Sequence, residues 1–263
     1  MSISLEQLRI WEQAEMERSD YEAAHTDGMD LRVSDRTFER YLDPPADTPF
    51  AIEYAYNLLG DVRGKDVLDL GCGNGENTIL LANRGAKVSG LDISDSLINL
   101  ARRRMQVNGF VEGFEFFTGS AHELPFPDRS FDVVFGMAIL HHLDLEQTSR
   151  EVWRVLRPGG YAIFMEPVRN SKLLCLIRGL IPYRAPDVSP FERPLTDREL
   201  ERFAARFGQY RSAAYQLPFA NVAVSLPILR DFATFFTRVD HSLLKRAEWL
   251  RWYATVRVIK VVK

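Results

Sequence analysis

Short apolar runs alternate with segments of helical periodicity through the middle of the chain. Runs of strand length stand at 66–71, 87–93, 114–119, 131–137 and 161–167. Helical segments follow several of them, at 76–84, 95–108 and 145–156. The last two are expected to end at Asn108-Gly109 and at Pro158-Gly159-Gly160. Short strands that alternate with helices predict right-handed crossovers and a parallel sheet covered on both faces. The pattern therefore predicts a doubly wound α/β domain.

Less regular segments flank this alternation. Over residues 1–24 the apolar positions fall on one broad face, which predicts a helix, and a short helix is expected at 50–60. An irregular and partly apolar insertion occupies about 168–195. Thr196 and Glu199 have the spacing of a capping box. The remaining elements are expected as a helix at 196–207, a strand at 210–217, helices near 221–236 and 241–252, and a last strand at 255–262.

The composition is that of an ordinary globular domain, and it narrows the possible partners. The chain has 263 residues, of which 46% are hydrophobic and 26% charged, so a large core is possible. The net charge of −3 disfavours a general nucleic-acid binder, so no nucleic-acid partner is expected. Two cysteines are too few for a disulfide framework or a zinc cluster, and no metal site is expected. An acidic N-terminus and the lack of a long apolar stretch predict a cytoplasmic protein without a membrane span.

A glycine-rich turn separates the first strand from the helix that follows. The stretch VLDLGCGNG (67–75) contains Gly71, Gly73 and Gly75, and glycine permits positive φ and a close approach to the backbone. A turn into a helix N-terminus also presents free N–H groups and the positive end of the helix dipole. A ligand is therefore expected against this backbone, at the carboxyl end of the first strand.

The spacing of the loop limits the class of ligand. Glu76 stands where a dinucleotide fingerprint has its third glycine, so a carboxylate would repel a pyrophosphate. A P-loop is excluded because no Lys-Ser/Thr pair follows. Asp92 ends the second strand about 20 residues on, where an acid commonly accepts hydrogen bonds from ribose hydroxyls. The loop and this acid together favour a nucleoside that carries little negative charge.

Four stretches in this order carry a resemblance to a known family. They are VLDLGCGNG (67–75), LDIS (91–94), GSAHELPFPDRSFDVVFGMAILHHL (119–143) and REVWRVLRPGGYAIFMEP (150–167). With them, the sequence resembles a class I S-adenosylmethionine-dependent methyltransferase of the type 11-like small-molecule group, over about residues 60–167. The resemblance implies a Rossmann-like sheet of seven strands, mostly parallel with an antiparallel last strand. It also implies S-adenosylmethionine as the methyl donor and S-adenosylhomocysteine as the product.

The resemblance assigns cofactor contacts to the glycine loop. Gly71, Gly73 and Gly75 would approach the methionine and ribose portions of the donor. Cys72 would pack within the cofactor loop. Asp69 would order the loop and lie near the methionine amino group.

The nucleoside end is assigned to the second, third and fourth strands. Asp92 would hold the ribose hydroxyls, with Ile93 packing on the adenine. The adenine edge and the end of the fourth strand would be contacted by Ser120, Ala121, His122 and Met137. Here the chain departs from the family, because it reads Gly-Ser-Ala where many relatives read Gly-Asp-Ala. The charged acceptor for the adenine amino group is therefore missing, which leaves Ser120, His122 or Glu123 to take part.

Two adjacent histidines follow the fourth strand, at the edge of the sheet where the methyl group would be transferred. A neutral imidazole could take a proton from a hydroxyl, an amine or an acidic carbon. Because adjacent side chains point in different directions, at most one of His141 and His142 is expected to face substrate. Packing, helix-entry hydrogen bonding and cofactor positioning stay open as alternatives. Glu166, at the end of the fifth strand, is placed where it could touch substrate.

The function expected from these features is methyl transfer by in-line displacement to a small organic acceptor, with oxygen slightly favoured. The apolar insertion and the aromatic tail indicate a hydrophobic acceptor, although most of these aromatic residues are expected to cover the core. We expect residues 1–60 to form a helical cap over the cofactor site, and 61–263 to form the methyltransferase domain with a lid-like insertion at about 168–195. Two alternatives stay open: a methyltransferase that acts on RNA or protein, and a non-catalytic module that binds the cofactor.

Overall fold

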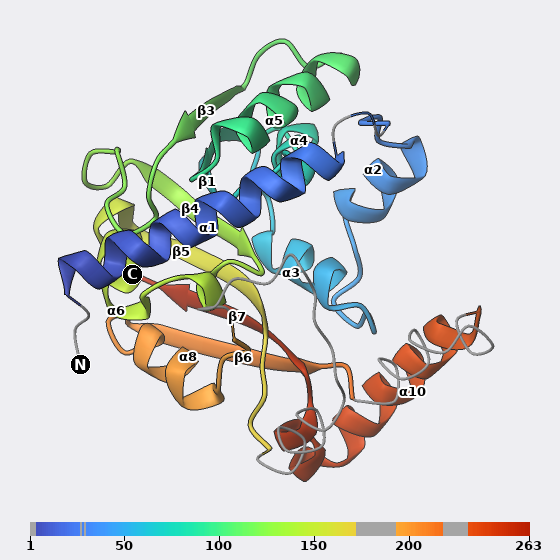
Figure 1. Ribbon diagram of the computed structural model, residues 1–263. Coiled ribbons are helices and arrows are strands. Elements are labelled where there is room, and N and C mark those ends of the chain that lie inside the picture. The colour runs from blue at the N-terminus through green and yellow to red at the C-terminus, as the bar shows by residue number, and fades with distance from the viewer. Residues whose placement is uncertain (1–3, 27, 29, 172–192, 218–230) are drawn as a thin grey trace.

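A seven-stranded sheet crosses the centre of the molecule (Figure 1). The computed structural model describes residues 4–26, 28, 30–171, 193–217 and 231–263. In their order across the sheet the strands are β3 (Phe114–Thr118), β2 (Lys87–Asp92), β1 (Asp66–Leu70), β4 (Phe131–Met137), β5 (Leu156–Pro167), β7 (Val256–Val262) and β6 (Gln209–Tyr215). The first five pair in parallel, and β7 pairs antiparallel to both β5 and β6. The predicted doubly wound sheet with an antiparallel last strand is confirmed.

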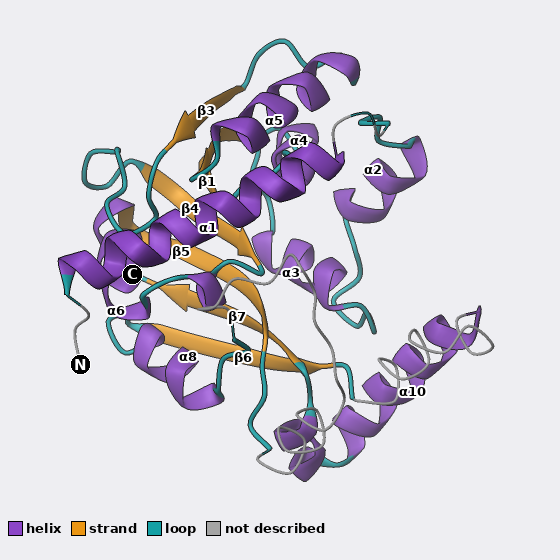
Figure 2. Cartoon of the chain, viewed as in Figure 1, coloured by secondary structure: helices purple, strands orange, loops and turns teal. Residues whose placement is uncertain are grey.

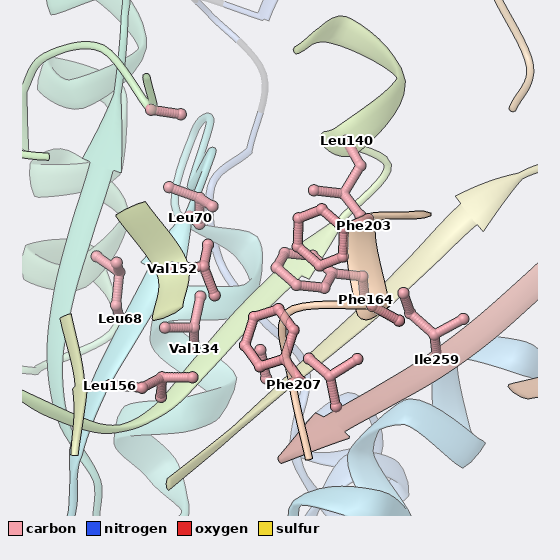
Figure 3. Close-up of a cluster of buried hydrophobic side chains, with 14 of the residues drawn as sticks. Leu68, Leu70, Val134, Leu140, Val152, Leu156, Phe164, Phe203, Phe207 and Ile259 are labelled. Atoms are coloured by element: carbon pink, nitrogen blue, oxygen red, sulfur yellow. The ribbon is translucent and has the colours of Figure 1, made fainter. Parts of the chain in front are cut away.

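Helices cover both faces of this sheet (Figure 2). Alternate strand residues point to opposite faces, and in β1 Val67 packs on one side while Leu68 packs on the other. The face of Val67 is covered by α3 (Ala51–Leu59), α4 (Glu76–Asn83) and α5 (Asp95–Val107). The face of Leu68 is covered by α6 (Leu145–Val155) and α8 (Asp197–Ala204), and Figure 3 shows part of that cluster. The core therefore lies in two layers, one on each side of the sheet.

The N-terminal segment forms two helices outside these layers, α1 (Leu5–Thr26) and α2 (Asp35–Leu42). Figure 1 shows α1, in dark blue, extending across the molecule from the side of α6 to that of α5. Near its C-terminal end, Ala23 of α1 is buried in one cluster with Leu97 and Leu100 of α5. The expected N-terminal helix is therefore present, and it is packed onto the domain.

The start of β5 differs from the sequence prediction. We expected Pro158-Gly159-Gly160 to separate a helix from a strand that begins at Tyr161, but β5 already begins at Leu156. The pairing with β4 is irregular there, since Phe131 pairs with Leu156 while the next register pair joins Val133 and Tyr161. Such irregularities accept proline and glycine, and Gly159 has a φ of 77°. Breaker residues inside a strand are therefore accommodated as a bulge.

The C-terminal helices also differ from expectation. Among the described residues, α10 (Ala233–Arg246) is followed by the 3-10 helix η3 (Glu248–Tyr253), so the range predicted as one helix at 241–252 is divided between the end of α10 and η3. Ala247 has an extended backbone, with a φ of −128° and a ψ of 94°, which interrupts the helix. Most of the insertion at 168–195 and most of the helix predicted near 221–236 lie outside the described residues. No helix in the described ranges is both long and apolar enough to cross a membrane.

Candidate active site

A cavity of about 400 Å³ lies at the carboxyl ends of β1, β2 and β4, beneath α1. The strand order reverses between β1 and β4, and open α/β sheets bind ligands at such a point. The volume falls in the range of small-molecule sites. Ten of the residues singled out from the sequence line this cavity: Gly71, Gly73, Asp92, Ile93, Ser120, Ala121, His122, Met137, His141 and His142.

The loop positions 71 and 73 are glycines for different structural reasons. Gly71 has a φ of 70°, and a Cβ there would lie 2.5 Å from Cδ1 of Ile139, in the turn after β4. Gly73 has a φ of 52°, and nothing lies within 4 Å of where its Cβ would stand. Its backbone N–H donates to Oδ2 of Asp92 at 2.9 Å. The loop thus passes close to the β4 turn at Gly71 and leaves open space at Gly73.

Three other predicted loop residues lie behind the wall of the cavity. Gly75 has a φ of 83°, and a Cβ there would lie 2.9 Å from that of Ala101, so its glycine is required by packing against α5. Cys72 is buried, and burial raises the pKa of its thiol well above the ordinary value. A thiol of that kind is unreactive. Asp69 is 1% exposed and lies beneath the loop.

Asp69 is a buried carboxyl group with one satisfied oxygen. Its Oδ2 accepts a hydrogen bond of 2.6 Å from Oγ1 of Thr78. Among the described residues, its Oδ1 has no hydrogen-bond partner. Burial raises the pKa of Asp69 to about 7, although the hydrogen bond from Thr78 acts against this rise. A cationic group that reached Oδ1 would satisfy it, so the site suits a ligand that carries an ammonium group.

Asp92 is held with both carboxylate oxygens in fixed positions. Oδ2 accepts the N–H of Gly73 and Oδ1 accepts the N–H of Ser94 at 3.1 Å. Each oxygen keeps a further lone pair that can accept a hydroxyl hydrogen bond. The residue is 8% exposed, and burial raises the pKa of its carboxyl group. This arrangement suits a pair of neighbouring hydroxyls such as those of a ribose.

The turn after β4, η1 (Leu140–His142), is held by Glu166. The carboxylate of Glu166 is fully buried, and one oxygen accepts the N–H groups of Ile139 and Leu140 at 3.0 and 2.8 Å. Its other oxygen lies 2.8 Å from Nδ1 of His141. Glu166 therefore lies beneath the turn and does not line the cavity. The sequence had placed it where it could touch substrate. Glu166 makes Nδ1 of His141 the donor and Nε2 the basic position of the ring.

His142 faces a different partner from that of its neighbour. Its Nδ1 lies 3.0 Å from Oε2 of Glu15, a buried residue of α1. The two imidazole rings are 4.0 Å apart. His141 is thus tied to the sheet through Glu166, and His142 is tied to the helix above. This division agrees with the expectation that the two side chains point in different directions.

The third histidine of the site, His122, has both ring nitrogens engaged. Its Nε2 accepts the backbone N–H of Asp144 at 2.9 Å, so the proton of the neutral ring is on Nδ1. Nδ1 lies 2.9 Å from Oε1 of Glu12, which also accepts a hydrogen bond from the hydroxyl of Ser120. His122 is therefore a link between α1 and the loops below it rather than a free base.

Glu12 and Glu15 were not found by sequence analysis. Both lie on α1 and line the cavity together with Arg18, Ser19 and Glu22. Their positions, with Leu8 and Trp11, continue one helical face on which polar residues follow apolar ones. Carboxylates that continue the face of Leu8 and Trp11 at helical spacing are the signal that could have identified them. The hydroxyl of Ser94, which donates to Asp20 at 2.6 Å, adds a further polar contact between α1 and the domain.

A second, larger cavity of about 930 Å³ adjoins the first. The two share Trp11, His141 and Leu143 in their walls. His141 thus stands at the junction of the two cavities. In the part of the chain that the structure describes, no group of three or more His, Cys, Asp or Glu side chains is arranged to hold a metal ion.

The sequence of this chain is similar to those of known methyltransferases. Residues 68–164 match a family model described as a methyltransferase domain. The chain is 36% identical over 151 residues to a fatty-acid O-methyltransferase of Mycolicibacterium smegmatis, covering 56% of this chain and 47% of that protein. It is 32% identical over 200 residues to the 27-O-demethylrifamycin SV methyltransferase of Amycolatopsis mediterranei, covering 65% of this chain and 72% of that protein. The chain therefore spans about half the length of the first relative and most of the second.

A solved structure shows the same fold. A SAM-dependent methyltransferase from Methanosarcina mazei superposes with a TM-score of 0.53 at 24% identity. The superposition covers 76% of this chain and 93% of that one. At this level of identity the likeness concerns the arrangement of the sheet and its helices.

Proposed function

This chain belongs to the class I S-adenosylmethionine-dependent methyltransferases, and on that premise we propose that it methylates an oxygen atom of a small organic acceptor. The observation that carries the proposal is the position of His141, which Glu166 orients at the junction of the two cavities. The two relatives described above are named for transfer to oxygen, which favours oxygen over carbon or nitrogen.

The methyl donor would bind along the glycine loop. Asp92 would accept hydrogen bonds from the ribose hydroxyls, and the open backbone at Gly73 would let the donor approach. Oδ1 of Asp69 would attract the ammonium group. At the expected adenine edge, the carboxylate of Glu12 lies beside Ser120, the position at which many relatives carry an aspartate. We therefore assign to Glu12 the role of acceptor for the adenine amino group.

When bound, the donor supplies a methyl group activated as a sulfonium, and in the reaction the carbon–sulfur bond breaks as the carbon–oxygen bond forms. The task left to the chain is to align the acceptor and to remove its proton. Nε2 of His141 would take the hydroxyl proton, and Glu166 would stabilise the resulting imidazolium. The helix α1 would act as a cap that excludes water and lowers the local dielectric constant.

Calorimetry with S-adenosylmethionine, S-adenosylhomocysteine and NAD tests the cofactor part of the proposal. We expect the first two to bind and NAD not to bind. Asp92→Asn should weaken both by roughly 10- to 100-fold, because one of the two acceptor oxygens is lost and the remaining hydrogen bond is no longer to a charged group. Absence of binding, or unchanged affinity in the variant, would contradict the assignment of this cavity.

Transfer of a labelled methyl group to phenols and carboxylic acids tests the chemistry. In His141→Gln we expect kcat to fall by roughly 10² to 10⁴-fold while the donor affinity stays close to that of the wild type. Glu166→Gln should give a smaller loss, with a shifted pH profile. His142→Gln is the comparison, since its ring lies against Glu15. If His142→Gln lost turnover and His141→Gln kept it, the roles of the two histidines would have to be exchanged.

A further inference from the structure

The larger cavity lies between α6 and α8 and has an apolar wall. Trp11, His141 and Leu143 form the side that it shares with the cofactor cavity. The rest of its apolar lining consists of Leu145, Trp153, Leu195, Phe203 and Ala205. A molecule that fills this cavity would therefore bury an apolar body and reach His141 with one end.

The carboxylates in the wall of this cavity are already engaged. Asp144 caps α6 by accepting the backbone N–H of the third residue that follows it. Glu146 pairs with Arg150, and Glu199 forms an ion pair with Arg193. The negative charges of the wall are thus used within the protein.

Two cations of the wall stay available. Arg202 belongs to α8 and Arg206 follows its end, and both side chains are exposed to solvent. Within the described residues neither guanidinium group has a carboxylate partner. A guanidinium group binds a carboxylate with two parallel hydrogen bonds. Two such groups, four residues apart in the sequence and in the wall of one cavity, can therefore bind an anion.

We propose that this cavity is the acceptor site, and that the acceptor is an elongated apolar molecule with an anionic group at one end. The anionic group lies against Arg202 and Arg206, and the hydroxyl that is methylated lies at His141. The apolar body packs on Trp153 and Phe203 between them. This inference rests on the proposed function, because it takes the acceptor oxygen to be at His141.

A hydroxyphenyl-octanoic acid and its methyl ester form a matched pair of probes, since they differ in the anionic group alone. Binding of each is measured by calorimetry with S-adenosylhomocysteine present, so that no turnover is needed. The acid should bind roughly 10-fold more tightly than the ester, as expected for charge-assisted hydrogen bonds. The double variant Arg202→Gln/Arg206→Gln should lose this preference and keep the affinity for the ester.

The matched control is Arg198→Gln, which removes an exposed arginine of α8 that does not line the cavity. It should keep the preference for the acid. Equal binding of acid and ester to the wild-type protein, or a preference that survives in the double variant, would overturn the proposal. Formation of the methyl ester in place of the aryl methyl ether would show that the carboxylate lies at His141, and would overturn the proposed orientation.

The two proposals fail in different ways. If the acid preference depends on the two arginines but no acceptor is methylated, the acceptor site stands and the proposed function falls. If phenols are methylated without any preference for the acid, the proposed function stands and the anionic end of the acceptor is wrong.

Discussion

At the scale of single residues, Asp69 is a buried carboxyl group of the site whose pKa departs from its ordinary range. Its folded-state pKa of about 7 lies above the ordinary value of 3.8, because the carboxyl group is buried. Between these two values the folded protein holds a proton that the unfolded chain has released. The contribution of Asp69 to the free energy of unfolding therefore falls as the pH rises from the lower value to the higher one.

Asp69→Asn removes this dependence. The free energy of unfolding of the wild type minus that of the variant should fall by roughly 2 kcal/mol between about pH 5 and pH 7. Urea titrations of both proteins at several pH values measure this difference. A difference that does not change with pH would mean that Asp69 is ionised in the folded protein throughout the range.

Glu12 gives a second prediction at this scale. Its carboxylate lies beside Ser120 and would accept the adenine amino group. S-Inosylhomocysteine has a carbonyl oxygen in place of that amino group, so the carboxylate should repel it. The wild type should prefer S-adenosylhomocysteine over the inosine analogue, and Glu12→Gln should reduce the ratio of the two affinities by roughly 10-fold.

Using a ratio of two affinities separates recognition from a general loosening of α1. If Glu12 serves only to hold His122, the affinities for both compounds will fall together in Glu12→Gln. An unchanged ratio of the two affinities would indicate that the loop after β3, and not Glu12, contacts the adenine amino group.

The residues that the sequence could not reveal are those supplied from a distance. The glycine loop and Asp92 follow one another closely along the chain, so local spacing was enough to find them. Glu12 meets Ser120 across 108 positions, and no local pattern pairs them. At Gly75 the sequence suggested a contact with the ligand, and the fold adds a second reason for a glycine that no local pattern shows, the close approach of Ala101 of α5.

At the scale of elements, α1 is the helix whose placement decides whether the cavity is closed. It brings acidic and apolar residues over the cavity, while Ala23 anchors its far end on Leu97 and Leu100. The sequence predicted that a helix would be present. It could not show that the acidic face of this helix points toward the cavity, because packing decides which face points inward. The same limit explains β5, whose breaker residues look like a boundary until the pairing with β4 is known.

Ala23→Arg tests the role of α1 as a cap. A long cationic side chain cannot be accommodated at a position that is 4% exposed, so α1 should detach while the sheet stays folded. Hydrogen exchange over residues 8–23 should become faster, and S-adenosylmethionine should bind at least about 10-fold more weakly. Ala24→Arg is the matched control, because Ala24 is exposed on the same helix. Equal cofactor affinities in the two variants would show that α1 is not needed to bind the donor.

At the scale of the whole molecule, the sheet and its surroundings have different roles. The family match covers residues 68–164, which hold the glycine loop, Asp92 and His141. Trp11, Arg202 and Arg206 lie outside that range, on α1, on α8 and in the turn just after α8. The cofactor chemistry could therefore be predicted from motifs. The acceptor could not be predicted in the same way, because the acceptor site that we propose depends on how the terminal segments pack on the common sheet.

The two cavities share a wall, and this predicts that their ligands bind cooperatively. Trp11 of α1 contacts both spaces, so a ligand in either one fixes the helix that the other ligand also needs. S-Adenosylhomocysteine should increase the affinity for the hydroxyphenyl-octanoic acid by roughly 5-fold, and the acid should increase the affinity for S-adenosylhomocysteine by the same factor. Calorimetric titrations in both orders measure the two factors.

Two tryptophan variants separate this coupling from simple contact. Trp153 lines only the larger cavity, so Trp153→Ala should weaken binding of the acid and keep the coupling factor. Trp11→Ala should remove the coupling, because the shared wall is lost. Thermodynamic linkage requires the two factors to agree in each protein, which checks the measurement itself. Coupling that persists in Trp11→Ala would mean that the cavities communicate through the other shared residues, His141 and Leu143, and not through α1.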